Sequence, residues 1–473
     1  MLHRTLCLLL VGGLGALPAL AQDRKQPVDS LLTTTLTALN AGAEYPSLRW
    51  PRVTDVAEEL HHSYAGREFS PLWSKGGVPT PAARAVLDAL ATVDTRGLDA
   101  EDYDVARLRS LARNGLGSTE IRADFDITLS VAALRVLHTL RNGRISASEA
   151  HARLQLPQDT MDFSAELLAL SQSATPSKVL DAAEPPYLHY RLLKSALAVY
   201  RAEAAADTSV LPHVRQIILT LERWRWLPHH FVTTPIFVNI PAFRLYALGL
   251  NSDREADMLA MDVVVGDAFG HQTPVFSGEL ADIIFAPYWD VPSSIALAEL
   301  VPIALRDPHL LTVNNYEIVD QRDRPLPATL TNVRRVAAGR ARIRQLPGGS
   351  NALGRVKFVF PNDFNVYLHD TPVQAAFERE RRDISHGCIR IADPGALARL
   401  LLRDQPAWDS AAVGTAMSGL DPQRVPLTHS VPVHIVYATA VAREDGRIFF
   451  YDDIYGLDQK LSAQLAAGYP YRR

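Results

Sequence analysis

The chain has 473 residues, 47% of them hydrophobic and 21% charged, and its formal net charge is −4 at pH 7. This length predicts two or three domains with packed cores. A mildly acidic chain without a run of lysine and arginine lacks the electrostatic footprint of a nucleic-acid-binding protein, which excludes nucleic acid as a partner.

Residues 1–21 have the pattern of a secretory signal peptide. Arg4 precedes an apolar run over residues 6–20, and the expected cleavage site follows the small residue Ala21. The run is shorter than the ~20 residues that span a bilayer, so an uncleaved anchor is the less favoured alternative. No later stretch is long and apolar enough to span. We therefore expect an exported protein without an integral membrane segment after signal cleavage.

The next part of the chain is expected to be helical. Residues 22–44 lack a sustained apolar period and are interpreted as a polar, partly helical lead-in. The longest helical pattern of segment 45–206 has apolar residues at Ile121, Phe125, Leu129, Ala133, Val136 and Leu140. Shorter helices are predicted over 80–93, 164–170 and 186–203, and a connecting helix within 207–228.

Segment 229–456 contains short runs rich in β-branched and aromatic residues, which predict strands. These runs are 236–240, 244–248, 261–265, 283–288, 356–360, 366–369, 433–439 and 448–451. An insertion over 292–347 is helical and basic. Its arginines either meet ligand carboxylates or form a solvated face, and they are Arg334, Arg335, Arg340, Arg342 and Arg344. Residues 457–473 are interpreted as a C-terminal tail.

The chemistry is expected to centre on Cys388. Removal of the signal peptide takes away Cys7 and leaves Cys388 as the only cysteine. A lone thiol in an oxidising compartment, beside polar neighbours, favours a reactive cysteine over a buried structural one. A thiol with a pKa of ~8.5 needs a base to act as a nucleophile at pH 7. His369, at the end of a predicted strand, and His386 are the candidates.

The glycine beside the cysteine adds a second element of the site. Gly387 allows a substrate to approach the backbone closely, and the amides of Gly387 and Cys388 are candidates for an oxyanion hole. A different interpretation is a zinc site made from His369, His386 and Cys388. This interpretation is less favoured, because no fourth ligand or activated-water partner is evident.

Residues 385–390, with the sequence Ser-His-Gly-Cys-Ile-Arg, follow a predicted strand that ends in His369. This arrangement resembles the catalytic motif of the L,D-transpeptidases with a YkuD-type domain, cysteine enzymes that cross-link bacterial peptidoglycan. Residues 368–372, with the sequence Leu-His-Asp-Thr-Pro, resemble the large periplasmic YcbB-type branch. Further segments that resemble this branch are 221–228, 238–241, 272–276, 287–292 and 453–456, so the resemblance covers roughly residues 45 to 456.

The resemblance implies an α+β fold in the periplasm. It consists of a helical N-terminal scaffold domain and a mixed, β-sandwich-like catalytic domain, with 292–347 as an inserted capping subdomain. Relatives often carry a peptidoglycan-binding module before the connecting helix. Here only residues 206–211 separate the scaffold from that helix, which is too short for a domain. Substrate recognition is therefore expected to rest on the catalytic domain.

By the same resemblance, Cys388 attacks the diaminopimelate carbonyl of a donor tetrapeptide stem while His369 takes the thiol proton, and a thioester forms. Transfer to the amine of a second diaminopimelate gives a 3-3 cross-link. Water as acceptor makes the enzyme a carboxypeptidase, and a protein lysine makes it an anchoring enzyme. The expected partners are peptidoglycan stem peptides, with no cofactor and no metal, and carbapenems are expected to acylate Cys388. A non-catalytic wall-binding protein is a further alternative.

The remaining site residues are expected to orient the catalytic pair or to contact the substrate. The backbone carbonyl of Asp370 is expected to orient His369, and His386 to shape the pocket. Arg390 is expected to hold the loop or a substrate carboxylate. The other residues expected to contact the substrate are Ser385, Tyr288, Trp289 and Tyr367.

Overall fold

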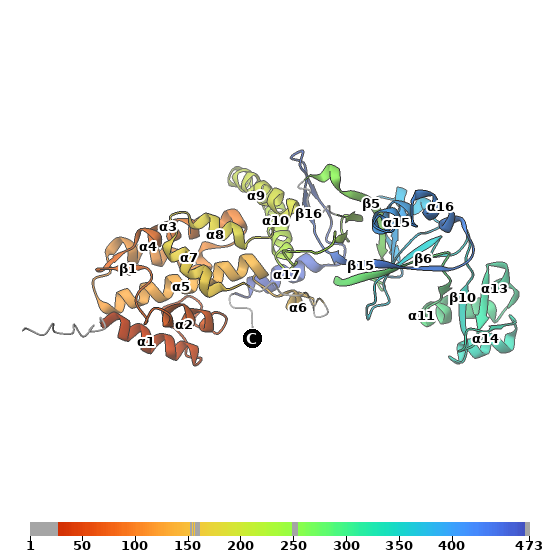
Figure 1. The fold of residues 1–473 in the computed structure, drawn as a ribbon, viewed down its shortest axis with the longest axis horizontal. Coiled ribbons are helices and arrows are strands. Elements are labelled where there is room, and N and C mark those ends of the chain that lie inside the picture. The colour runs from red at the N-terminus through yellow and green to blue at the C-terminus, as the bar shows by residue number, and fades with distance from the viewer. Residues whose placement is uncertain (1–26, 152–153, 155, 157–160, 248–253, 469–473) are drawn as a thin grey trace, which may run out of the picture.

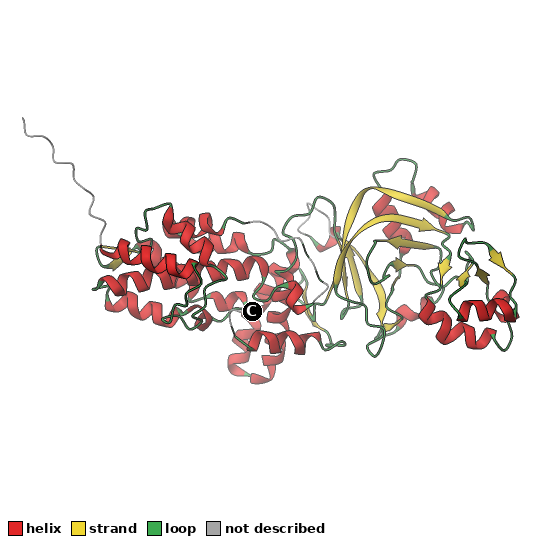
Figure 2. Cartoon of the chain, turned by 90° about the horizontal axis from the view of Figure 1, so that it is seen from below, coloured by secondary structure: helices red, strands yellow, loops and turns green. Residues whose placement is uncertain are grey.

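The computed structural model describes residues 27–151, 154, 156, 161–247 and 254–468, so the expected signal peptide lies outside the described part. Figure 1 shows an elongated molecule with helices at one end, a strand-rich body beside them and a small subdomain at the far end. The predicted order of a helical region followed by a mixed α+β region is confirmed (Figure 2). Within the described residues, no helix is both long and apolar enough to cross a bilayer.

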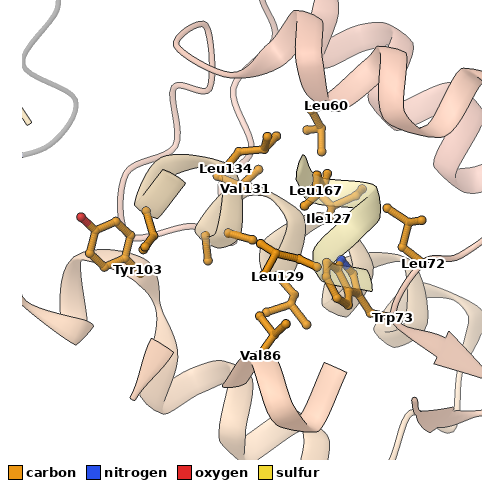
Figure 3. Close-up of a cluster of buried hydrophobic side chains, with 14 of the residues drawn as sticks. Leu60, Leu72, Trp73, Val86, Tyr103, Ile127, Leu129, Val131, Leu134 and Leu167 are labelled. Atoms are coloured by element: carbon orange, nitrogen blue, oxygen red, sulfur yellow. The ribbon is translucent and has the colours of Figure 1, made fainter. Parts of the chain in front are cut away.

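The N-terminal region packs around α5 (Thr119–Asn142), which is buried on nearly every side. A helix that is buried all round belongs at the centre of a bundle. Figure 3 shows Leu129 of α5 close to Trp73, and Ile127 of the same helix close to Leu167. The other elements of this region are α1 (Pro27–Asn40), α2 (Ala57–Ala65), β1 (Ser74–Lys75), β2 (Val78–Pro79), α3 (Pro81–Leu90), α4 (Val105–Asn114), α6 (Ala147–Ala150), α7 (Phe163–Gln172) and α8 (Pro176–Ala183).

The segment 22–44, expected as a polar, partly helical lead-in, contains a long helix that belongs to the helical core. Residues 27–40 form α1, and its apolar face is fully buried in the helical core. The buried residues are Val28, Leu32, Leu36 and Leu39, which recur at helical spacing. The pattern is diluted by the five threonines and serines on the other face, which explains why the period escaped the sequence analysis.

Two helices join the helical region to the strand-rich region. α9 (Leu188–Ala206) and α10 (Leu211–Trp224) pack against each other, and Trp224 meets Phe237 with ring centroids 5.6 Å apart. Residues expected to form a tail instead form α17 (Leu457–Ala466), which packs against α10. Arg223 of α10 and Asp458 of α17 form an ion pair at this junction, so α17 stabilises the connection between the two regions.

The strand-rich region is built on a nine-stranded sheet with the order β13-β5-β14-β12-β11-β6-β15-β3-β4. β5 also pairs with β4, so the sheet curls and closes as a barrel. Three of its pairings are parallel, those of β12 with β14, β13 with β5 and β15 with β3. The strands are β3 (Ile236–Asn239), β4 (Arg244–Ala247), β5 (Leu259–Gly266), β6 (Phe276–Phe285), β11 (Val356–Val359), β12 (Leu368–His369), β13 (Asp383–Ser385), β14 (Ile389–Ile391) and β15 (Gln423–Val436).

Helices and a second strand pair complete this region. α15 (Pro394–Leu402) begins at a cap in which the Asp393 carboxylate accepts a hydrogen bond from the Ala396 amide at 2.8 Å. Its buried Leu397 and Leu402 cover the barrel core together with α16 (Ser410–Ser418). A separate ribbon pairs β16 (Ala440–Ala442) with β17 (Ile448–Phe450).

The insertion folds as a subdomain with its own apolar core and a small sheet of order β7-β10-β8-β9. It lies at the end of the molecule farthest from the helical region (Figure 1). Its elements are β7 (Trp289–Asp290), α11 (Ser293–Ile295), the π-helical turn η5 (Ala296–Leu300), α12 (Val301–Ala304), α13 (His309–Val313), β8 (Tyr316–Val319), β9 (Pro325–Leu326), α14 (Leu330–Ala337) and β10 (Arg342–Gln345).

Candidate active site

Two neighbouring strands bring the candidate nucleophile and base together. β12 and β14 are parallel, with His369 opposite Arg390. Side chains alternate along a strand, so Tyr367 and His369 share one face with Cys388 and Arg390. Leu368 and Ile389 point the other way, into the barrel core. The pairing of β12 with β14 therefore brings His369 and Cys388, which are well separated in the sequence, to the same face of the sheet.

His369 is nearly inaccessible and is held in one orientation. Only 4% of the residue is exposed, and Nδ1 lies 2.5 Å from the backbone carbonyl oxygen of Asp370. When Nδ1–H donates to this carbonyl, Nε2 is left as the acceptor nitrogen of the ring. Burial, together with the positive charges of Arg390 and Lys357, lowers the pKa of His369 to about 3. The imidazole is therefore neutral at pH 7 and able to accept a proton.

Cys388 is partly exposed and rests as a thiol. Its Sγ lies 3.6 Å from the carbonyl oxygen of Asn365, and among the described residues it has no hydrogen bond with His369. Burial raises the pKa of Cys388 above its ordinary value, while hydrogen bonds from Tyr367 and the charge of Lys357 act in the opposite direction. The resting pair is thus a neutral thiol beside a neutral imidazole, and proton transfer belongs to the attack on a substrate.

The side chain of Ser385 holds the loop that carries Cys388 in place. The buried Ser385 hydroxyl donates to the Cys388 carbonyl oxygen at 2.6 Å and accepts from the Gly387 amide at 3.1 Å. The expectation that Ser385 contacts the substrate does not fit this geometry, because both hydrogen-bonding directions of the hydroxyl are used within the loop. Ser385 is instead a positioning residue.

The same geometry narrows the candidates for the oxyanion hole. The Gly387 amide already donates to Ser385, whereas the Cys388 amide has no hydrogen bond within the described part of the chain. Gly387 has a φ of 108°, a conformation that side chains disfavour, which explains the glycine at this position. In this state the Cys388 amide is the available donor.

A segment outside the catalytic motif supports the loop from the other side. Thr273 is buried, and its hydroxyl donates to the Gly387 carbonyl oxygen at 2.8 Å. The Gly266 amide donates to the Thr273 hydroxyl at 2.8 Å, which ties the end of β5 to the same point. Gly266 cannot carry a side chain here, because a Cβ atom would lie 1.8 Å from the His271 carbonyl oxygen. From the sequence, residues 272–276 stood out only through the family resemblance, and Thr273 was not among the predicted site residues.

His386 connects the loop to the inserted subdomain. Its Nε2 lies 3.0 Å from Oε1 of Glu299, which belongs to the π-helical turn η5. The His386 ring also lies 4.8 Å from the ring of His271, whose Nδ1 is 2.8 Å from Oδ2 of Asp267. The contacts of His386 are thus with Glu299 and His271, and its expected role in shaping the pocket stays a prediction. The contact with Glu299 was not foreseen from the sequence.

The remaining carboxylate of the motif is structural. Asp370 is buried, and its Oδ2 accepts a hydrogen bond from the Arg355 amide at 2.8 Å. Gly354 leaves the space for this carboxylate, since a Cβ there would lie 2.3 Å from Oδ2. The backbone carbonyl of Asp370 therefore faces His369, while its side chain braces the turn before β11.

Tyr288 and Trp289 form the connection from β6 into the inserted subdomain, and both are partly buried. The guanidinium of Arg344 lies 4.1 Å above the Tyr288 ring and pairs with Glu317 at 2.6 Å. Arg342 is likewise paired within the subdomain, whereas Arg334 and Arg340 are exposed. The basic insertion thus divides into arginines that hold its own fold and arginines that face solvent.

Lys357 belongs to the same face but was missed by the sequence analysis. It lies on β11 directly opposite His369, and its Nζ is 4.4 Å from the centre of the Tyr367 ring. The available signal was a single charged residue within an otherwise apolar strand, Val356–Val359. His369 is therefore flanked across the sheet by Lys357 on one side and Arg390 on the other.

The zinc interpretation can be checked against side-chain placement. Among the described residues, no three histidine, cysteine, aspartate or glutamate side chains are arranged so that they could hold a metal ion. His369 is buried with Nδ1 on a carbonyl, and His386 is turned toward Glu299. The three proposed zinc ligands do not converge.

Residues 234–426 match the family model of an L,D-transpeptidase catalytic domain, and residues 58–197 match that of a scaffold domain. The chain carries an L,D-transpeptidase catalytic domain. It is also 27% identical over 408 residues to a Haemophilus influenzae protein described as "Putative L,D-transpeptidase". This alignment covers 85% of this chain and 78% of that protein. The L,D-transpeptidase match includes the catalytic motif, β11 and the inserted subdomain, so the whole site lies within it.

Proposed function

We propose that the protein is a periplasmic peptidoglycan L,D-transpeptidase of the YcbB-type branch that forms 3-3 cross-links. The observation that carries the proposal is the placement of Cys388 and His369 on one face of β12 and β14, with a buried, neutral imidazole. The catalytic-domain match supports the reaction class, and the scaffold-domain match supports the branch. The signal-peptide pattern of residues 1–21 supports export.

In the acylation step, Sγ of Cys388 attacks the carbonyl carbon of the diaminopimelate residue at the third position of a donor tetrapeptide. Nε2 of His369 accepts the thiol proton as the bond forms. The carbon–nitrogen bond to the terminal D-Ala then breaks, and His369 returns the proton to the departing amine. The product is a thioester on Cys388, and the Cys388 amide is the donor available to the developing oxyanion.

In the second step, the amine of another diaminopimelate attacks the thioester carbonyl and gives its surplus proton to the Cys388 sulfur by way of His369. Water at ~55 M competes with this amine, so transfer needs an acceptor held in place and a site that excludes solvent. The inserted subdomain supports such an arrangement, because Glu299 contacts the loop of the nucleophile at His386. Tyr288 and Trp289 lie where the chain passes from β6 into this subdomain.

The decisive experiment uses purified protein and disaccharide-tetrapeptide, with the products separated by liquid chromatography and identified by mass spectrometry. We expect a 3-3 linked dimer and free D-Ala from the wild type, and neither from Cys388→Ala or His369→Ala. Tripeptide as the sole product under acceptor excess would replace transpeptidation by carboxypeptidation. Attachment of a labelled lysine-containing peptide to the wall, without either product, would favour the anchoring enzyme. Absence of all three would leave the non-catalytic alternative.

A further inference from the structure

Lys357 and Arg390 are two cations without acidic partners. Both are only partly exposed, and they lie on either side of His369 in one row across β11, β12 and β14. Among the described residues, neither forms an ion pair with a carboxylate or a side-chain hydrogen bond. Two groups act electrostatically on Lys357, Asp290 and Cys388, and Asp290 is already paired with Arg342 at 3.0 Å. Cys388 is also the group that acts electrostatically on Arg390.

Partial burial of an unpaired cation is costly, and folded proteins normally supply a counter-charge. Elsewhere on the same barrel, the partly buried Arg382 pairs with Asp262 at 3.0 Å. Arg424 stands opposite Ile284, which in turn stands opposite Lys357, and Arg424 pairs with Asp282 at 2.7 Å. Burial lowers the pKa of Lys357, as expected for a cation that lacks a strong partner. Lys357 and Arg390 are therefore two positive charges that an anionic group of a ligand can neutralise.

The Cys388 thiolate is not the anion that neutralises Lys357 and Arg390 in the resting site. Burial raises the pKa of Cys388, so the resting site contains a thiol. The Tyr367 side chain interacts with Cys388, and Nζ of Lys357 lies 4.4 Å from the centre of the Tyr367 ring. Within the described part of the chain, neither Lys357 nor Arg390 has a hydrogen bond with the Cys388 sulfur. The missing anion must instead arrive with the substrate, on the face where the scissile carbonyl meets Cys388.

A tetrapeptide donor supplies such a group. One residue beyond the attacked carbonyl, its chain ends in a carboxylate, which is close enough to the reacting bond to meet residues that border His369. In a donor with a fifth residue this position is a neutral amide, which can neither neutralise two cations nor end the chain there. An ammonium and a guanidinium are the groups that bind carboxylates through charge-assisted hydrogen bonds.

We infer that Lys357, together with Arg390, binds the terminal carboxylate of the donor stem peptide and so restricts the enzyme to donors that end one residue past the scissile bond. The inference rests on the proposed function and names the specificity determinant of the same site. Lys357 selects the donor by charge, while Cys388 and His369 perform the chemistry.

The test compares two donors in the full-length mature protein, disaccharide-tetrapeptide with a free terminal carboxylate and the same compound as its terminal amide. Release of D-Ala or D-alaninamide is followed by mass spectrometry, and kcat and KM are determined separately. We expect the wild type to prefer the carboxylate by about 10- to 100-fold in kcat/KM, as for a hydrogen bond to a charged group. Lys357→Met should reduce this preference to less than about threefold, mainly through KM, and Lys357→Arg should retain most of it.

Arg424→Met is the matched control, because it removes a positive charge from the same row of the sheet that already has a carboxylate partner. Its donor preference should equal that of the wild type. The ratio compares two donors on one preparation, so a partly unfolded variant does not distort it. Equal use of both donors by the wild type, or an equal loss on both donors in Lys357→Met, overturns the inference. A wild type that releases no terminal residue from either donor contradicts the proposed function instead.

Discussion

Replacement of Ser385 by alanine tests how the nucleophile loop is held. The buried hydroxyl donates to the Cys388 carbonyl at 2.6 Å and accepts from the Gly387 amide at 3.1 Å, so the change leaves a buried amide and a partly buried carbonyl without partners. An unsatisfied buried polar group costs about 1–3 kcal/mol, and Ser385→Ala should therefore destabilise the catalytic domain by about 2–4 kcal/mol. A domain of this size should then melt roughly 4–15 °C lower.

The same change should slow the chemistry, because the loop that loses these hydrogen bonds carries Sγ. A loss of about 1.4 kcal/mol in positioning corresponds to a tenfold lower rate, so acylation by a carbapenem should slow by at least about tenfold. Intact-protein mass spectrometry over time measures this rate, and differential scanning fluorimetry measures the melting temperature. Ser418→Ala is the control, since the exposed Ser418 hydroxyl donates only to the Gly414 carbonyl of its own helix at 2.9 Å. If Ser385→Ala melts and reacts within twofold of the control, the hydroxyl does not hold the loop.

Two further predictions concern protonation and the inserted subdomain. Burial lowers the pKa of His369 to about 3, so its neutral form persists as the pH falls below 6.5 and is lost only near the lower value. The carbapenem acylation rate should hence change little between pH 7 and 5.5, whereas an imidazole with an ordinary pKa would be about 90% protonated at pH 5.5 and the rate would drop about tenfold. Glu299→Ala removes the exposed contact with His386, which is worth about 0.2–1 kcal/mol. Donor turnover should fall by less than about fivefold and become less sensitive to 0.5 M salt than in the wild type, and an unchanged salt response would contradict the role of this contact.

The sequence predicted those parts of the molecule that depend on local patterns. The long apolar period of residues 121–140 became α5, and Asp393 followed by Pro394 marked the start of α15, because helix spacing and capping are encoded in neighbouring residues. The fold class and the catalytic domain were predicted from the motif around Cys388. Strand ends were less predictable. β6 begins at Phe276 rather than at residue 283, because polar side chains face outward along its first half.

The features missed by the sequence analysis depend on which strands become neighbours. The barrel depends on the pairing of β15 with β3 and of β14 with β5, strands that are far apart in the sequence. Lys357 looked like one charge in an apolar strand, and only the register of β11 with β12 places it opposite His369. The hydrogen bonds of Ser385 and the contact between His386 and Glu299 arise in the same way, from loop conformation and from an insertion folding back over the site.

The claim that Cys388 is the nucleophile for the peptidoglycan donor can be measured directly. Wild-type protein is mixed with disaccharide-tetrapeptide in the absence of an acceptor, quenched in acid, digested and analysed by tandem mass spectrometry. We predict a disaccharide-tripeptide adduct on the peptide that contains Cys388, released by hydroxylamine as expected for a thioester and absent from Cys388→Ala. An adduct on another residue, or one that persists in Cys388→Ala, would contradict the proposed mechanism.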